Sequence, residues 1–108
     1  MTAVIAVDLG TTGVKAGVWS EDGRLLAEAY RRRGVRQGAD GFALQNAEES
    51  WELQRQAVAE AARAIPEPIG ALVLTHQRGT FAPADATGRP LGDYIVWMDR
   101  RGAPICDR

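Results

Sequence analysis

The sequence has little of several features that would assign a protein to a class at once. It contains one cysteine, Cys106, so no disulfide can form within the chain, as expected for a reducing cytoplasm. It has no apolar run long enough to span a membrane, because the first run, residues 4–7, is interrupted by Asp8. The net charge of −1 gives no electrostatic reason to expect nucleic acid or an anionic membrane as a partner.

The remaining composition is that of a folded protein. Hydrophobic residues make up 45% and charged residues 25% of the 108 positions, a balance typical of globular domains. A chain of this length forms one small domain and buries roughly two-thirds of its unfolded surface. Residues 99–108 resemble the first turns of a helix with no terminating signal, so we expect residues 1–108 to be part of a longer protein.

Between positions 8 and 15 the chain carries a carboxylate, two glycines, two threonines and a lysine. These are Asp8, Gly10, Thr11, Thr12, Gly13 and Lys15. The glycines let the backbone turn tightly and aim amides at an anion, while the threonines and the lysine add donors for phosphate oxygens. A carboxylate would repel phosphate unless a divalent metal lay between them, so Asp8 indicates Mg²⁺, held through water. The segment predicts a site for nucleotide phosphate, although a β-hairpin with a glycine-rich turn has a similar composition.

Three short strands are expected at the start of the chain. Residues 4–7, 14–19 and 25–30 have strand-like patterns, and Asp22-Gly23 between the last two is a strong hairpin signal. The three strands are therefore predicted to be antiparallel neighbours. We interpret the basic triplet that follows, residues 31–33, as a solvated edge.

A helix is predicted from Asn46 onward. Asn46 and Glu49 have the spacing of a capping box, with asparagine in place of serine or threonine, and Pro66 ends the helical pattern. Apolar residues recur at helical spacing on one face, and Trp51 is the first large one. We therefore expect Trp51 to anchor the core.

A continuous apolar run at residues 71–74 predicts a strand that is covered on both faces. A strand, a helix and a second strand in this order predict a crossover unit, which makes the sheet a mixed α/β sheet. Polar residues 75–80 follow directly, at the end of a central strand, where α/β sheets usually bind ligands.

Three separated motifs resemble the N-terminal part of the FGGY family of carbohydrate kinases, which includes xylulokinases, glycerol kinases and gluconate kinases. The motifs are Asp8-Leu9-Gly10-Thr11-Thr12, Thr75-His76-Gln77-Arg78 and Ile95-Val96-Trp97-Met98-Asp99-Arg100-Arg101. They occur in the family's order and extend over essentially the whole chain. The last two together are specific, whereas the first also occurs in actin and heat-shock ATPases.

The resemblance implies a ribonuclease-H-like (actin-like ATPase) fold, with residues 1–108 as the N-terminal part of the first kinase domain. The full-length enzyme would use ATP and Mg²⁺ to phosphorylate a sugar or polyol in the cytoplasm, and it could be a homodimer. The positions expected to bind the nucleotide are Asp8, Gly10, Thr11, Thr12 and Lys15. The positions expected to line the acceptor pocket are His76, Gln77, Arg78, Trp97 and Asp99. The family's catalytic aspartate is expected beyond residue 108, so the isolated chain should be inactive.

Several of these residues also have purely structural interpretations. His76 could be a hydrogen-bonded histidine at a strand end, Arg78 could pair with Asp99, and Trp97 could belong to the core. Gly79 stands where glycerol kinases carry a glutamate, which removes an acceptor for polyol hydroxyls and leaves xylulose-like ketoses, sugar acids and polyols all open as substrates. The alternative from another class is a non-catalytic, actin-type nucleotide-binding module, which needs no acceptor pocket.

Overall fold

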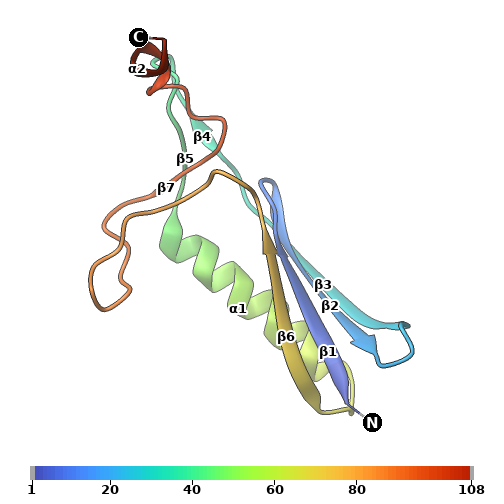
Figure 1. Ribbon diagram of the computed structural model, residues 1–108. Coiled ribbons are helices and arrows are strands. Elements are labelled where there is room, and N and C mark those ends of the chain that lie inside the picture. Colours follow the sequence, from blue (N-terminus) through green and yellow to red (C-terminus); the bar gives the residue numbers. More distant parts are fainter. Residues whose placement is uncertain (1, 108) are drawn as a thin grey trace.

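A mixed four-stranded sheet and one long helix form the lower part of the molecule in Figure 1. The computed structural model describes residues 2–107. The sheet has the order β3-β2-β1-β6, with β1 (Ala3–Leu9), β2 (Gly13–Ser20), β3 (Leu25–Arg32) and β6 (Ile69–His76). The first three strands are antiparallel and β6 is parallel to β1, so the predicted opening of the sheet and the crossover are both confirmed.

A smaller sheet extends from the end of the first one and gives the molecule its elongated shape, 55 × 28 × 22 Å (Figure 1). Its order is β4-β5-β7, with β4 (Arg36–Gln37), β5 (Ala43–Gln45) and β7 (Tyr94–Ile95). The chain then ends in a short helix, α2 (Ala103–Cys106). Among residues 2–107, no helix is long and apolar enough to cross a membrane.

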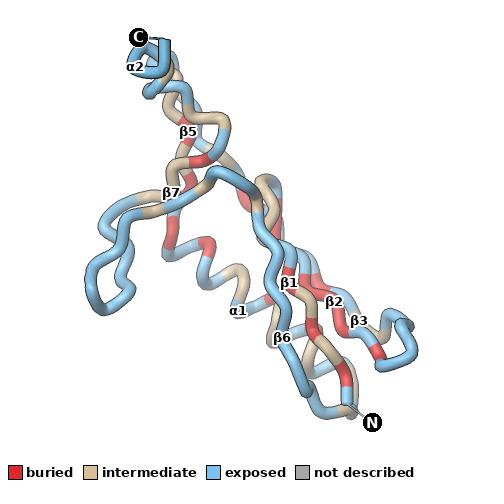
Figure 2. The backbone as a smooth tube through the Cα atoms, in the orientation of Figure 1, coloured by how far each residue is buried: buried red, intermediate tan, exposed pale blue. Residues whose placement is uncertain are grey.

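The core lies between the large sheet and the helix α1 (Ala47–Arg63). Side chains that alternate along β1 and β2 face α1 and are almost fully buried, as the red segments of Figure 2 show. They include Ile5, Val7, Val14, Ala16 and Val18. The helix meets them with small residues, of which Ala57 and Ala61 are at most 1% exposed. Small side chains allow the helix backbone to approach the sheet closely.

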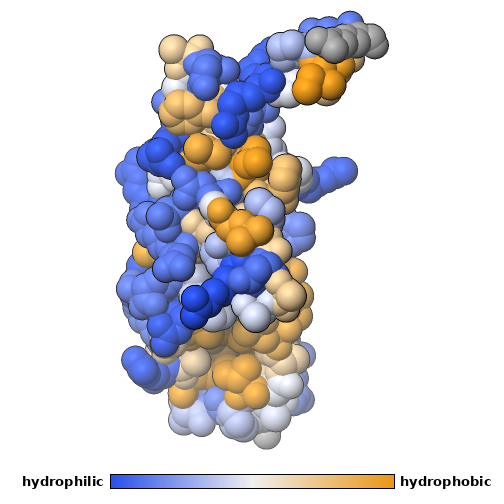
Figure 3. All heavy atoms as spheres, turned by 90° about the vertical axis from the view of Figure 1, so that its left-hand side faces the viewer, coloured by the Kyte–Doolittle hydropathy of each residue, from blue (hydrophilic) through white to orange (hydrophobic). Residues whose placement is uncertain are grey.

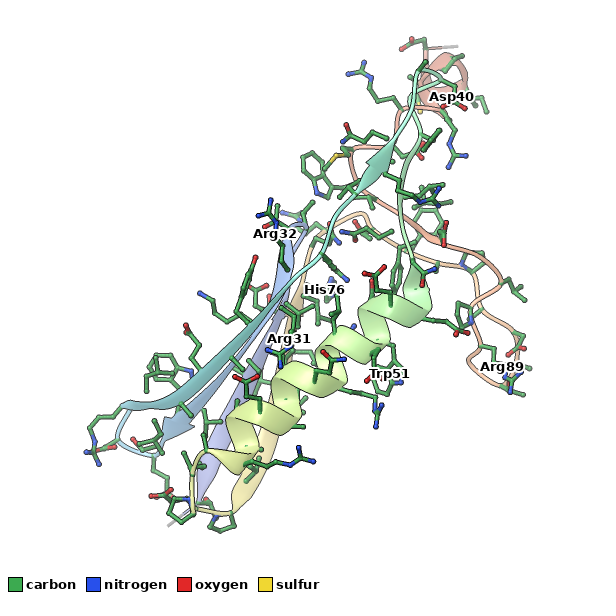
Figure 4. The ribbon with its side chains drawn as sticks, turned by 180° about the vertical axis from the view of Figure 1, so that it is seen from behind. Arg31, Arg32, Asp40, Trp51, His76 and Arg89 are labelled. Carbon is green, nitrogen blue, oxygen red and sulfur yellow. The ribbon has the colours of Figure 1, made fainter. Side chains whose placement is uncertain are left out.

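The N-terminal cap of α1 is confirmed, but the role expected for Trp51 is wrong. The Asn46 side chain accepts a hydrogen bond from the Glu49 amide at 2.8 Å. Trp51 is 61% exposed and points away from the sheet (Figure 4). The buried face is centred on Ser50, Ala57 and Ala61, and Trp51 lies about 100° from Ser50 around the helix axis, at the edge of that face. Trp51 instead lines an open groove of about 720 Å³, formed with the hairpin residues 82–90.

Residues 71–74 have the pattern of a strand covered on both faces, but residues 2–107 do not provide that cover. Strand β6 is exposed along its whole length, with Leu72, Val73 and Leu74 more than half exposed (Figure 2). The reason is its position: β6 is an edge strand, and α1 packs mainly on β2 and β3. Apolar side chains therefore lie at the surface over the lower part of the molecule (Figure 3).

Candidate functional site

The loop between β1 and β2, residues 10–12, is held in place by a buried arginine. Arg33 follows β3, is 8% exposed, and donates from Nε and Nη2 to the Gly10 carbonyl at 3.0 and 2.7 Å. Its own amide donates to the Thr12 carbonyl at 2.9 Å, and the Tyr30 hydroxyl donates to the same oxygen at 3.3 Å. Burial lowers the pKa of the Arg33 guanidinium. Within residues 2–107 no carboxylate lies within ion-pair distance of this buried cation.

The middle of the same loop is held by two glutamines and a tryptophan. Gln45, 2% exposed at the end of β5, donates from Nε2 to the Thr11 carbonyl at 2.7 Å. Its Oε1 accepts from Nε2 of Gln77 at 3.0 Å, and Oε1 of Gln77 accepts from the Thr11 hydroxyl at 2.8 Å. The Trp97 indole donates to that same hydroxyl at 3.0 Å. Thr11 thus connects the β1–β2 loop to residues that follow β6 and β7.

These contacts determine which backbone groups of the loop remain available. A trans peptide unit points its N–H opposite to its C=O, and none of the peptide bonds described between residues 2 and 107 is cis. Because the Gly10 carbonyl is bound by Arg33, the Thr11 amide faces away from the guanidinium. The Thr12 amide likewise faces away from Gln45. Within the described part of the chain neither amide donates a hydrogen bond, so both can bind an anion.

Asp8 and Lys15 are cross-strand partners near the same end of the sheet, with Thr75 beside Asp8 on β6. All three line a small cavity of about 160 Å³ on the sheet face opposite α1, together with Glu28. Asp8 is exposed and forms no ion pair with another residue of the described chain. A structural ion pair would have removed Asp8 from consideration as a metal-binding group.

Asp99 has a complete set of structural partners. Its carboxylate accepts from the Ala43 amide at 2.9 Å and forms an ion pair with Arg101 at 2.8 Å. The side chain is 7% exposed. Hydrogen bonds from Arg101 and Ala43 lower the pKa of Asp99 to about 2. Asp99 therefore joins β5 to the segment after β7, and the contact with the acceptor that we predicted for it stays a prediction.

The other acceptor-pocket candidates lie at the end of β6 and after β7. His76 is exposed at the last position of β6, where Nδ1 lies 3.0 Å from the Gln77 carbonyl (Figure 4). Arg78 is exposed and does not pair with Asp99, so that alternative is wrong. Trp97 is 57% exposed within residues 2–107, and its indole donates a hydrogen bond to the Thr11 hydroxyl.

Residues 3–108 match the family described as "FGGY family of carbohydrate kinases, N-terminal domain". The chain belongs to the FGGY family. The glycerol kinase of Trichormus variabilis is 39% identical over 108 residues, covering 95% of this chain and 21% of that protein. The glycerol kinase of Gloeobacter violaceus is 38% identical over 107 residues, covering 98% and 22%. The chain thus spans about a fifth of the length of the curated relatives it matches.

Solved structures of FGGY kinases have the same fold. A ligand-bound xylulose kinase from Lactobacillus acidophilus superimposes with a TM-score of 0.91 at 19% identity, over 99% of this chain and 22% of that one. Plasmodium falciparum glycerol kinase with ADP gives 0.91 at 20% identity, over 99% and 22%. The predicted actin-like ATPase fold is confirmed.

The FGGY motifs predicted the β1–β2 loop and the pocket candidates. They did not include Arg33 and Gln45, whose side chains bind the carbonyls of that loop. Arg33 belongs to the triplet that we interpreted as a solvated edge; Arg32 is exposed, whereas Arg33 is buried against the loop. Gln45 stands directly before the helix cap and carried no motif. Its one available signal is the strand alternation of β5, which places it on the same buried side as Ala43.

Proposed function

We propose that the full-length gene product transfers the γ-phosphoryl group of ATP to a hydroxyl of a sugar, sugar acid or polyol. Residues 1–108 would supply the phosphate-binding loop and part of the acceptor pocket. Membership of the FGGY family and the glycerol kinase relatives support this class of reaction. A catalytic carboxylate base is expected beyond residue 108.

The single observation that carries the proposal is the pattern of hydrogen bonds to the backbone of the β1–β2 loop. Its three carbonyls are bound by Arg33, Gln45 and Tyr30, which leaves the Thr11 and Thr12 amides available. Amides that are oriented before the ligand arrives stabilise the charge of a transferring phosphoryl group without reorganisation. In this role Thr11 acts through its backbone, because its hydroxyl proton is used by Gln77.

Mg²⁺ fits this site as a partner of the phosphates rather than as a metal held by protein ligands alone. Residues 2–107 contain no cluster of three acidic, histidine or cysteine side chains that could hold a metal. A single free carboxylate, Asp8, is sufficient for Mg²⁺, which takes one or two carboxylates and completes its shell with phosphate oxygens and water. Bound there, the ion would neutralise phosphate charge. Lys15 beside Asp8 would add a second positive charge.

The acceptor side of the proposal depends on Arg78 and Trp97. The exposed guanidinium offers fixed donors to hydroxyl oxygens, and the half-exposed indole offers an apolar wall. Gly79 lies between Gln77 and the β7 hairpin with a φ of +66°, a backbone conformation that a side chain would strain. A Cβ at this position would lie 3.6 Å from Cβ of Trp97, and glycine provides no carboxylate there to accept from a polyol hydroxyl.

Steady-state kinetics of the full-length protein against ketoses, sugar acids and polyols test the proposal. We expect Asp8→Ala to lower kcat by orders of magnitude while calorimetry shows unchanged acceptor binding. Arg78→Ala should weaken acceptor binding by about 1.5–3 kcal/mol, roughly ten- to a hundredfold. Arg89→Ala is the matched control, because Arg89 lies exposed on the distant hairpin (Figure 4).

Two results would contradict the proposal in different ways. Nucleotide binding without phosphorylation of any acceptor would favour the non-catalytic, actin-type module. Phosphorylation with an acceptor KM that Arg78→Ala leaves unchanged would retain the reaction and reject the pocket assignment.

A further inference from the structure

One residue, Thr11, belongs to both halves of the proposed site. Its amide is left free by the contacts around the loop, and its hydroxyl bonds to residues of the acceptor side. That hydroxyl donates to Gln77 at 2.8 Å and accepts from the Trp97 indole at 3.0 Å. A threonine hydroxyl has one proton to donate, and this proton is used.

The hydrogen bonds around Thr11 form a chain with one direction. The Trp97 indole donates to the hydroxyl, the hydroxyl donates to Gln77, Gln77 donates to Gln45, and Gln45 returns to the Thr11 carbonyl. An indole nitrogen can only donate, so Trp97 requires an acceptor at this point. Hydrogen bonds in such a series reinforce one another, and removing one member leaves the groups directly bonded to it without a partner.

The position of the Trp97 side chain depends more on this series of hydrogen bonds than on packing against neighbouring side chains. Its side chain is 57% exposed, and its backbone is fixed by a bond from its amide to the Thr80 hydroxyl at 3.0 Å. The indole contact with Thr11 joins positions 86 residues apart. Gln45 is 2% exposed, so the end of the hydrogen-bond series that is farthest from Trp97 lies in the interior of the protein.

We propose that the Thr11 hydroxyl and Gln45 are positioning groups that orient Trp97 and Gln77 relative to the phosphate-binding amides. The inference rests on the proposed function. Nucleotide bound at the Thr11 amide and acceptor packed on Trp97 are then linked through one residue. The hydroxyl is not a phosphate ligand, in contrast to the role predicted for it from the motif.

The test uses the full-length protein and the isosteric variant Thr11→Val, with Thr11→Ser as the matched control. Thr11→Val removes the hydroxyl without changing the shape of the side chain, and serine restores it. Misplacing a bound group by about 1 Å costs up to roughly a hundredfold in rate, so we expect kcat of Thr11→Val to fall ten- to a hundredfold. The KM for ATP should stay within about threefold, and Thr11→Ser should behave like the wild type.

A spectroscopic readout makes the test independent of turnover. The protein is labelled with 5-fluorotryptophan, and the ¹⁹F resonance of Trp97 is assigned by its loss in Trp97→Phe. We expect ADP with Mg²⁺ to shift this resonance in the wild type and in Thr11→Ser. In Thr11→Val it should be displaced before ADP is added and should not respond to it. Gln45→Met interrupts the chain at its buried end and should give the same two effects if Thr11→Val does not fold.

The outcomes separate this inference from the proposed function. ADP that binds by calorimetry with no response at Trp97 overturns the inference and leaves the nucleotide site intact. A Thr11→Val variant with a raised KM for ATP and unchanged kcat identifies the hydroxyl as a phosphate ligand, which also overturns it. A wild-type protein that binds no ADP overturns the proposed function and the inference together.

Discussion

Replacing Arg33 by methionine should change the orientation of the β1–β2 loop with little change in the free energy of unfolding. The substitution keeps a long side chain but removes two hydrogen bonds to the Gly10 carbonyl, at 3.0 and 2.7 Å. Hydrogen bonds from a charged donor contribute about 1.5–3 kcal/mol. Against this, burying a guanidinium that has no carboxylate partner within residues 2–107 costs several kcal/mol in lost hydration. An uncharged methionine at this position does not have that cost.

The two contributions oppose each other, so we expect the free energy of unfolding of Arg33→Met to change by less than about 1 kcal/mol. The effect on the loop has no such compensation. Without the guanidinium the Gly10 carbonyl can turn toward the ligand side, which reverses the Thr11 amide. ADP affinity should fall about tenfold, or about 1.4 kcal/mol.

Urea unfolding and ADP calorimetry of the full-length protein measure the two quantities separately. Arg32→Met is the matched control, because Arg32 is the exposed neighbour and its side chain makes no hydrogen bond to the loop. Unchanged ADP affinity in Arg33→Met would refute the argument that Arg33 orients the loop. A loss of affinity accompanied by a large loss of stability would assign the effect to unfolding instead.

Two further predictions concern stability. The pKa of Asp99 is lowered from 3.8 to about 2 in the fold, mainly by Arg101, so its contribution is present above pH 3.8 and is lost as the pH falls through 2. Asp99→Asn should remove that part of the acid dependence, followed by circular dichroism between pH 5 and 2; an unchanged acid profile would contradict the assignment. Ile5→Ala, at a position 1% exposed, should cost about 2–5 kcal/mol in urea unfolding, whereas Ile105→Ala, at a position 72% exposed, should cost less than about 0.5 kcal/mol. Equal costs at the two sites would show that β1 is not part of the core.

The sequence by itself determined the local elements and the family. The Asp22-Gly23 turn, the Asn46 cap and the order of strands around the helix were all predicted, and all are present. These signals depend on residues a few positions apart, because a turn requires particular backbone angles and a cap bonds within one helical turn. The FGGY motifs also carried the candidate loop and pocket residues.

Only the tertiary structure decided what covers each element and what holds the loop. Trp51 and β6 have apolar patterns typical of a core, yet both are exposed, because α1 turns its small residues toward the sheet and packs on β2 and β3. Arg33 and Gln45 are polar residues without a motif, and they become buried because they reach loop carbonyls 23 and 34 positions earlier in the chain. Burial and hydrogen bonding of this kind depend on which distant segments meet, and a pattern of neighbouring residues carries no such information.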